Sequence, residues 1–293
     1  MSTVAILGAG DLGGSIAQAL AAGGQVPRVL LIDAAAPVAA GKALDIQQSG
    51  AIEGFHCRLA ATDDVTAVAG AAVCVVADRA GAPAVEWHGD EGLPLLRRLV
   101  SYASDSPIVF AGAAQAGLLL HAGRDLGLPA RRLVGSAPEA YASAVRAIVA
   151  LEVGCSPGEV TLAVLGAPPV AGADARGAGG GLVIPWSEAS IGGYAVERVL
   201  TPVQIRRAEG RAARLWPPGP YTLGAAAARV VEGMLAASRR TFSAMTLLDG
   251  EFGVKDRVGI LPVRLSSRGV EEVRVPVLNA RERVLLETAL GAP

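Results

Sequence analysis

Cysteine is scarce in this chain: its 293 residues include three, at Cys57, Cys74 and Cys155. They have neither the dense, even pattern of a disulfide framework nor the paired spacing of a metal site. We therefore predict a reducing, cytoplasmic environment and no bound metal ion.

Charged residues and long apolar runs are also few. Charged residues make up 18% of the chain and the net charge is −1, so we expect neither nucleic acid nor an anionic membrane as a partner. Hydrophobic residues make up 52%, but the run over 65–77 contains Thr66 and ends at Asp78, which is too short for a membrane span. The first residues lead directly into a strand pattern, so we expect no signal peptide.

The most informative stretch is 4–33. A short apolar strand leads into Gly8-Ala-Gly10-Asp-Leu-Gly13 and an alanine-rich helix, and a second strand ends at Asp33. In such a fingerprint the glycines allow a tight turn, a close approach of the backbone to a pyrophosphate, and packing of the helix on the strand. Free N–H groups at the start of the helix attract the phosphates.

Asp33 follows Gly13 at the distance of about 20 residues that suits a carboxylate accepting hydrogen bonds from ribose hydroxyls. A carboxylate there disfavours a 2′-phosphate, so the predicted cofactor is NAD. The turn after the fourth predicted strand, at Ala77, completes the site. The predicted cofactor-binding residues are Gly8, Gly10, Asp11, Leu12, Gly13, Asp33 and Ala77.

Strand and helix patterns alternate in the first half of the chain. Strands are predicted at 3–7, 28–32, 57–60, 73–77, 107–111 and 132–134, and helices at 12–22, 37–49, 65–70, 90–103, 115–125 and 138–153. This alternation predicts an α/β fold with a Rossmann-type, doubly wound parallel sheet, formed by an NAD-binding domain over 1–140.

The second half has a different pattern. Strands are predicted at 160–165, 241–248, 257–265 and 270–275, a low-complexity segment at 167–181, and helices within 201–237, broken at 216–220, and at 279–290. This order predicts an α+β domain over 141–293 with an antiparallel sheet. Such a domain after a nucleotide domain usually carries the substrate contacts.

Several segments outside the fingerprint carry a second signal. They are Gly41-Lys-Ala-Leu-Asp-Ile-Gln-Gln48, 90–99, Val164-Leu-Gly166, Trp186-Ser-Glu-Ala-Ser-Ile-Gly-Gly193, 228–235, Leu248-Asp-Gly-Glu-Phe-Gly253 and the spacing over 263–283. Together they resemble the lactate/malate dehydrogenase family over nearly the whole chain. The resemblance implies hydride transfer between nicotinamide and a 2-hydroxy or 2-keto acid. It also implies a homodimer or larger assembly that pairs through the helix at 37–49.

The resemblance further implies a proton-carrying histidine, an aspartate that orients it, and an arginine that binds the substrate carboxylate. Pro168 stands at the position of the histidine, and no histidine follows His121. Tyr141 and Ala144 stand at the positions of the aspartate and the arginine. Arg146, two residues on, points about 200° away from position 144 on a helix.

The remaining family positions are also altered. The segment matching the mobile loop, 80–89, has no arginine at either loop position and carries Glu86. The turn at 111–113 lacks the expected asparagine. We therefore assign no catalytic residue and predict that ordinary 2-hydroxy-acid dehydrogenase activity is absent.

Three functions remain open. The first is a catalytically silent family member that acts as an NAD sensor, a scaffold or the partner of an active subunit. The second is an active NAD-dependent dehydrogenase for a neutral, non-carboxylate substrate, with His88 as the proton carrier. The third is an interaction protein without a cofactor. Asp78 next to the predicted pyrophosphate site would repel a dinucleotide unless Arg79 compensates.

The other notable side chains have structural interpretations. His56 and His121 fit a strand entrance and a helix face, and His88 fits a solvated loop. Tyr141 has too high an ordinary pKa for proton transfer at neutral pH, so we expect it to fill space. Tryptophans Trp186 and Trp216 are expected to be packing anchors.

Overall fold

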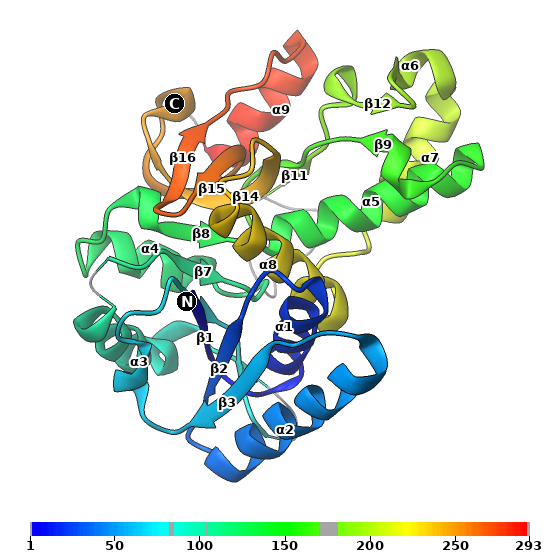
Figure 1. Cartoon of the computed structure of the whole chain (residues 1–293). Helices are drawn as coiled ribbons and strands as arrows, with labels where there is room; N and C mark the ends of the chain where they lie inside the picture. Colours follow the sequence, from blue (N-terminus) through cyan, green and yellow to red (C-terminus); the bar gives the residue numbers. More distant parts are fainter. Residues whose placement is uncertain (1, 82–84, 104, 170–180, 292–293) are drawn as a thin grey trace.

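The structure is a computed structural model that describes residues 2–81, 85–103, 105–169 and 181–291. A single large sheet runs through both halves of the chain, in the order β11-β10-β15-β14-β8-β7-β4-β1-β2-β3, with β16 on β15. The first strands and helices, blue to cyan, lie at the bottom of Figure 1, and the last strands and α9, orange to red, lie at the top.

The N-terminal half forms the predicted parallel sheet. Its strands are β1 (Thr3–Leu7), β2 (Arg28–Ile32), β3 (Arg58–Thr62), β4 (Val73–Val76), β7 (Ile108–Phe110) and β8 (Leu133–Gly135). Nearly every residue of β1 and β4 is buried, as expected when helices cover both faces of a parallel sheet. Strand order reverses between β1 and β4, and this switch point is where such sheets bind ligands.

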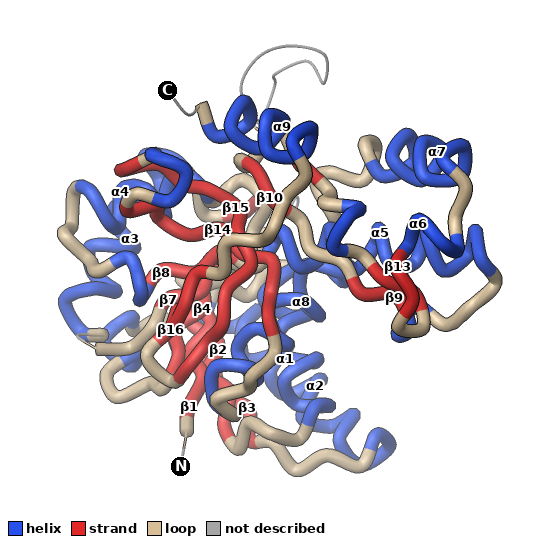
Figure 2. The backbone as a smooth tube through the Cα atoms, turned by 90° about the horizontal axis from the view of Figure 1, so that it is seen from above, coloured by secondary structure: helices blue, strands red, loops and turns tan. Residues whose placement is uncertain are grey.

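Helices cover the sheet on both sides. The main ones are α1 (Asp11–Gly23), α2 (Ala36–Glu53), α3 (Gly89–Tyr102), α4 (Ala116–Arg124), α5 (Ala137–Val153), α7 (Pro202–Ala212), α8 (Pro220–Leu235) and α9 (Ala280–Leu290). Figure 2 shows α1 and α2 on one side of strands β1–β3, with α3 and α4 on the other. None of the helices in the described part of the chain has the length and apolarity that a membrane crossing needs.

The helix predicted at 65–70 is wrong: Val65–Val68 form a short 3₁₀ turn. Asp64 accepts a hydrogen bond from the backbone N–H of Thr66 (2.9 Å), and the segment ends at Ala69 before Gly70, which has a φ of 75°. The stretch is too short for a stable α-helix with these stops.

The C-terminal half extends the same sheet. Strands β14 (Thr241–Asp249), β15 (Lys255–Ser266) and β16 (Gly269–Val273) are antiparallel, as predicted. β14 also pairs with β8 through Met245 and Gly135. The predicted antiparallel strands therefore continue the sheet of the N-terminal half. The predicted division at residue 140 falls within α5 and stays a prediction.

The strand predicted at 160–165 is split. β9 (Val160–Thr161) pairs with β12 (Ser190–Ile191), next to β13 (Tyr194–Ala195), whereas β10 (Leu165–Gly166) pairs with β11 (Leu182–Val183) and β15. Between β9 and β10, the backbone N–H of Val164 donates a hydrogen bond to Ser243 Oγ (2.9 Å) instead of to a neighbouring strand. A short helix, α6 (Val196–Val199), follows β13, and most of the low-complexity segment lies outside the described residues.

Close packing of α8 on α1 joins the two halves. Gly224 of α8 meets Ser15 of α1 so closely that a Cβ on Gly224 would lie 2.3 Å from Ser15 Oγ and 3.0 Å from its carbonyl carbon. No side chain fits at this crossing without movement of the backbone.

We predict that Gly224→Ala lowers the free energy of unfolding by about 1–3 kcal/mol, because the added methyl group overpacks the α1–α8 contact. Gly210→Ala is the matched control, since Gly210 is an exposed glycine in α7 with nothing within 4 Å of its Cβ position. That change should raise stability by about 0.5–1 kcal/mol. Urea unfolding measures both, and equal stabilisation by the two variants would contradict the close contact.

Candidate functional site

The predicted fingerprint forms the turn between β1 and α1 at the switch point of the sheet. Gly8 has a φ of 115°, and a Cβ on it would lie 2.1 Å from the carbonyl oxygen of Asp78. A Cβ on Gly13 would lie 2.1 Å from the carbonyl oxygen of Gly8. Both positions therefore need glycine for backbone packing, and the strand, turn and helix follow the predicted order.

Asp78 occupies the start of α1. Its carboxylate accepts hydrogen bonds from the backbone N–H groups of Leu12 (3.0 Å) and Gly13 (2.8 Å), and its carbonyl oxygen accepts one from Gly10 (3.1 Å). Only 4% of the residue is exposed. The sequence predicts that N–H groups at this helix start bind the phosphates of a dinucleotide. Asp11, the first residue of α1, is exposed.

The charge of Asp78 is buried and only partly compensated. Burial raises the pKa of the Asp78 carboxyl, while the hydrogen bonds from Leu12 and Gly13 and the charge of Lys42 act to lower it. Lys42 Nζ donates a hydrogen bond to the carbonyl oxygen of Gly10 (2.6 Å). Lys42 therefore lies beside the same turn and offsets part of the charge.

Asp33 is also held by the backbone of the chain. Its Oδ2 accepts hydrogen bonds from the N–H groups of Ala9 and Ala80, both at 2.8 Å, and its Oδ1 accepts one from Ala35 (2.9 Å). The residue is 6% exposed. The carboxylate predicted to bind ribose hydroxyls therefore has three partners within the protein.

The segment after β4 is a small hairpin of β5 (Asp78–Arg79) and β6 (Val85–Glu86). The residues between the strands, 82–84, lie outside the described part of the chain, as does that part of the predicted loop. Ala77 is fully buried, and its carbonyl oxygen accepts hydrogen bonds from Gln115 Nε2 (2.8 Å) and from the N–H of Trp87 (3.1 Å).

Side chains of the hairpin have local partners. The Glu86 carboxylate accepts hydrogen bonds from the N–H groups of Ala113 (3.2 Å) and Ala114 (2.9 Å), in the turn after β7. Arg79 pairs with Glu91 (2.8 Å) and lies 5.2 Å from the ring centre of Trp87. The Arg79 guanidinium, which could have compensated the negative charge of Asp78, therefore points toward α3.

The positions matched to catalytic side chains hold packing residues. Tyr141 is 4% exposed and meets Trp216 edge to face, with ring centres 6.1 Å apart, as expected for a space-filling pair. Burial raises the pKa of Tyr141 to about 12. Pro168 is half-buried after β10, and Ala144 is half-buried on α5.

Arg146 is held within its own helix. It forms an ion pair with the buried Glu139 (2.5 Å) and donates a hydrogen bond to the carbonyl oxygen of Ala142 (3.2 Å). The second oxygen of Glu139 accepts the N–H of Ser243 on β14 (3.0 Å), so the pair joins α5 to the sheet. Trp186, the other predicted anchor, is buried and donates its indole N–H to Glu209 (2.8 Å).

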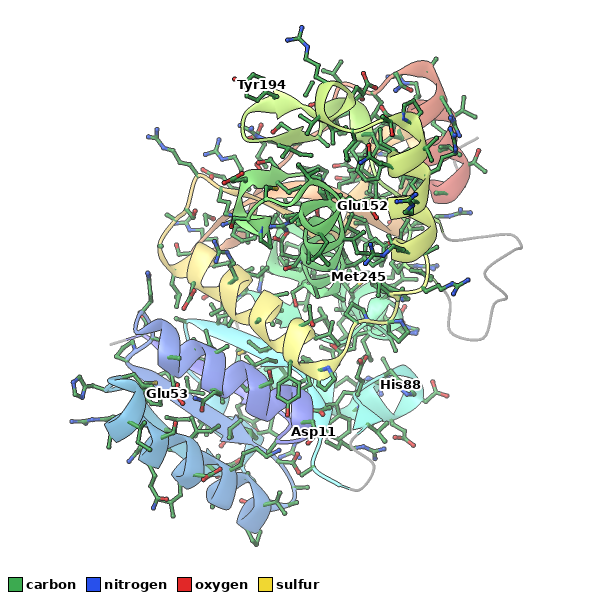
Figure 3. The ribbon with its side chains drawn as sticks, turned by 90° about the vertical axis from the view of Figure 1, so that its right-hand side faces the viewer. Asp11, Glu53, His88, Glu152, Tyr194 and Met245 are labelled. Atoms are coloured by element: carbon green, nitrogen blue, oxygen red, sulfur yellow. The ribbon has the colours of Figure 1, made fainter. Side chains whose placement is uncertain are left out.

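The three histidines lie at surface positions. His56 and His88 are exposed, and His121 on α4 pairs with Asp125, which directly follows the helix. His88 immediately precedes α3, and Figure 3 shows His88 and Asp11 close to the level at which the two halves of the molecule meet. Among the described residues, no three histidine, cysteine or acidic side chains gather as metal ligands.

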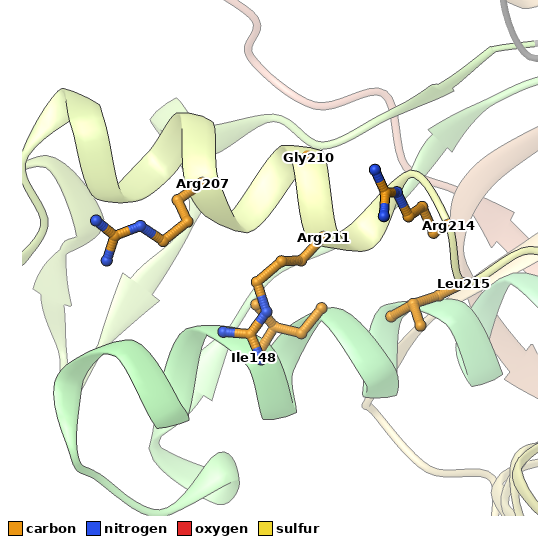
Figure 4. A pocket seen from close by; sticks show the side chains of 6 residues that line it. All are labelled: Ile148, Arg207, Gly210, Arg211, Arg214 and Leu215. Carbon is orange, nitrogen blue, oxygen red and sulfur yellow. The ribbon is translucent and has the colours of Figure 1, made fainter.

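A groove that the sequence did not predict lies between α5 and α7. It has a volume of about 580 Å³ and is lined by Ile148, Arg207, Gly210, Arg211, Arg214 and Leu215 (Figure 4). Arg207 and Arg211 both bind Glu152, at 3.3 and 3.2 Å. These ion pairs link α5 and α7. The groove contains no residue of the β1–α1 turn.

No family model matches the chain, but relatives match it along almost all of its length. It is 28% identical to the malate dehydrogenase of Thermomicrobium roseum, over 99% of this chain and 95% of the relative. It is 26% identical to that of Salinibacter ruber, whose crystal structure superposes with a TM-score of 0.84 over 99% of this chain and 94% of that one. These relatives support membership of the chain in the lactate/malate dehydrogenase family.

A second solved family member is the lactate dehydrogenase of Cryptosporidium parvum in complex with lactic acid and NAD. It superposes with a TM-score of 0.84 at 22% identity, over 99% of this chain and 95% of that one. At that identity the likeness concerns the fold, which is the mixed α/β architecture predicted from the sequence: a Rossmann-type sheet followed by a C-terminal half.

The raised pKa of Tyr141 predicts a stability change in alkaline solution. The neutral phenol is favoured in the folded chain, so its contribution is complete below pH 10 and is lost as pH rises toward 12. From pH 9 to pH 11 the wild-type chain should lose about 1 kcal/mol more stability than Tyr141→Phe. Urea unfolding of both proteins at the two pH values measures this difference, and an identical loss in both would contradict the buried phenol.

Proposed function

We propose that this member of the lactate/malate dehydrogenase family does not catalyse the oxidation or reduction of 2-hydroxy and 2-keto acids. The observation that carries the proposal is the absence of any histidine after His121, together with Pro168 in the half-buried place after β10. Without an imidazole there, nothing of suitable pKa exchanges a proton with a substrate hydroxyl.

The neighbouring positions on α5 support the same proposal. Tyr141 packs against Trp216 instead of offering a carboxylate, and Ala144 offers no guanidinium for a substrate carboxylate. Arg146 is engaged by Glu139. Loss of a general acid–base alone costs about 10²–10⁴ in rate. Loss of the charged groups that bind and polarise the substrate removes most of the rest, although such effects do not add simply.

Without catalysis, we propose that the fold serves association with another protein chain. The partner that we propose is a second copy of the same chain. Helix α2 carries large apolar side chains on its surface: Val38 is 50% exposed, Leu44 57% and Ile52 90%. Exposed apolar side chains on one helix favour burial against a second protein surface. A role as an NAD sensor would need free phosphate-binding N–H groups, and the contacts of Asp78 argue against it.

We predict that the purified chain oxidises NADH with pyruvate or oxaloacetate at least about 10⁴-fold more slowly than an ordinary member of the family. Absorbance at the nicotinamide band measures the rate, with the Salinibacter ruber malate dehydrogenase as a positive control. Turnover of about 1 s⁻¹ or more with either keto acid, in the range of ordinary enzymes, would sink the proposal.

The association through α2 has its own test. Light scattering should give the mass of two chains or a multiple of it for the wild type, and that of one chain for Leu44→Asp, because a buried carboxylate opposes the contact. Leu151→Asp is the control, since Leu151 is 73% exposed on α5 and should leave the mass unchanged. A wild-type chain that stays single at high concentration would rule out the pairing.

A further inference from the structure

The start of α1 is the place where a helix of this kind offers free N–H groups and a partial positive charge to an anion. In this chain the N–H groups of Leu12 and Gly13 donate to the buried carboxylate of Asp78, at 3.0 and 2.8 Å. Asp78 begins β5, two residues after the end of β4, and lies across the switch point from β1. An anion therefore already stands in the phosphate position, and it is part of the protein.

We propose that the Asp78 carboxylate is the resident anion of this site and excludes dinucleotides from it. The proposal goes beyond the lack of catalysis, because a catalytically silent chain can still bind a cofactor. It follows from the mismatch between NAD and the residues present: the fold supplies the place for a pyrophosphate, and an acidic side chain occupies it.

The close contacts at Gly10 support this assignment. A glycine in the middle of the fingerprint leaves room for a pyrophosphate beside the backbone. Here that room contains Asp78, because a Cβ on Gly10 would lie 2.3 Å from Asp78 Oδ2 and 2.4 Å from its carboxyl carbon. A phosphate group in the same space would collide with the carboxylate.

Electrostatics act in the same direction. A pyrophosphate brought to Leu12 and Gly13 would stand within a few ångströms of the Asp78 charge, in a site shielded from solvent. Asp11 adds a further negative charge near Asp78, and the positive charge of Lys42 opposes it in part. The same N–H groups cannot hold both anions at once.

The ribose position is closed by the same hairpin. Ala80, two residues after Asp78, donates its N–H to Asp33, whose carboxylate has two further backbone donors. Ribose hydroxyls would have to displace at least one of these bonds, at a residue that is 6% exposed. The two acidic residues thus close adjacent parts of one dinucleotide site.

A titration with NADH, followed by calorimetry and by nicotinamide fluorescence, tests the proposal on the full-length chain. The wild type should show no saturation up to about 1 mM NADH, and Asp78→Ala should bind at least about tenfold more tightly because two backbone donors become free. Asp78→Asn removes the charge but keeps a carbonyl acceptor, so its gain should be smaller.

Asp11→Ala is the matched control. It removes a negative charge from the same turn but leaves the hydrogen bonds of Leu12 and Gly13 in place, so it should gain less than about threefold. Circular dichroism and thermal unfolding check that each variant is folded. If Asp78→Ala does not fold, Asp78→Asn and the wild type carry the test, with inorganic pyrophosphate as a second probe that should raise the unfolding temperature of Asp78→Asn only.

Micromolar binding of NADH by the wild type would overturn the proposal, as would equal gains in Asp11→Ala and Asp78→Ala or no gain in a folded Asp78 variant. These results are distinct from failure of the proposed function, which is read from turnover. A wild-type chain that binds NADH without turnover would refute the exclusion of dinucleotides and leave the lack of catalysis standing.

Discussion

The buried carboxylate of Asp78, in the short strand β5 that follows β4, binds the first turn of α1 across the switch point of the sheet. It satisfies two N–H groups at the helix start, while its backbone carbonyl receives the N–H of Gly10. The hairpin that follows then brings Ala80 to Asp33 and Glu86 to the turn after β7. The loops at the carboxyl edge of the sheet are therefore bound to one another.

The residues that build the fold are separate from those that would perform the chemistry. A Cβ on Gly8 or on Gly13 would lie 2.1 Å from a backbone carbonyl oxygen, and one on Gly224 would overlap α1 at the crossing of α8. These positions need glycine whether or not a cofactor binds. Pro168, Tyr141 and Ala144 take no part in these contacts. The proposed lack of an acid–base pair is therefore compatible with the full architecture.

Much of the fold could be predicted from the sequence because its signals are local. The apolar run before Gly8 and the glycines after it fix β1 and the start of α1, and the structure has both where the sequence predicts them. The apolar pattern over 160–165 is continuous and predicts a single strand. Its division depends on the hydrogen bond between Val164 and Ser243, a partner 79 residues away.

The candidate site shows the same limit. The sequence places Asp78 next to the predicted phosphates and indicates repulsion, with Arg79 as possible compensation. It does not reveal that Asp78 turns inward to accept the N–H groups of Leu12 and Gly13, or that Arg79 turns toward Glu91. Side-chain direction at a strand end is set by tertiary contacts, which the hydrophobic pattern does not encode.

A crystal structure of the wild-type chain grown with millimolar NADH tests the central claim most directly, because it shows which anion stands at the start of α1. The account predicts the Asp78 carboxylate within hydrogen-bonding distance of the N–H groups of Leu12 and Gly13, and no dinucleotide at the switch point. A pyrophosphate bound to those N–H groups, with Asp78 turned away, would contradict it.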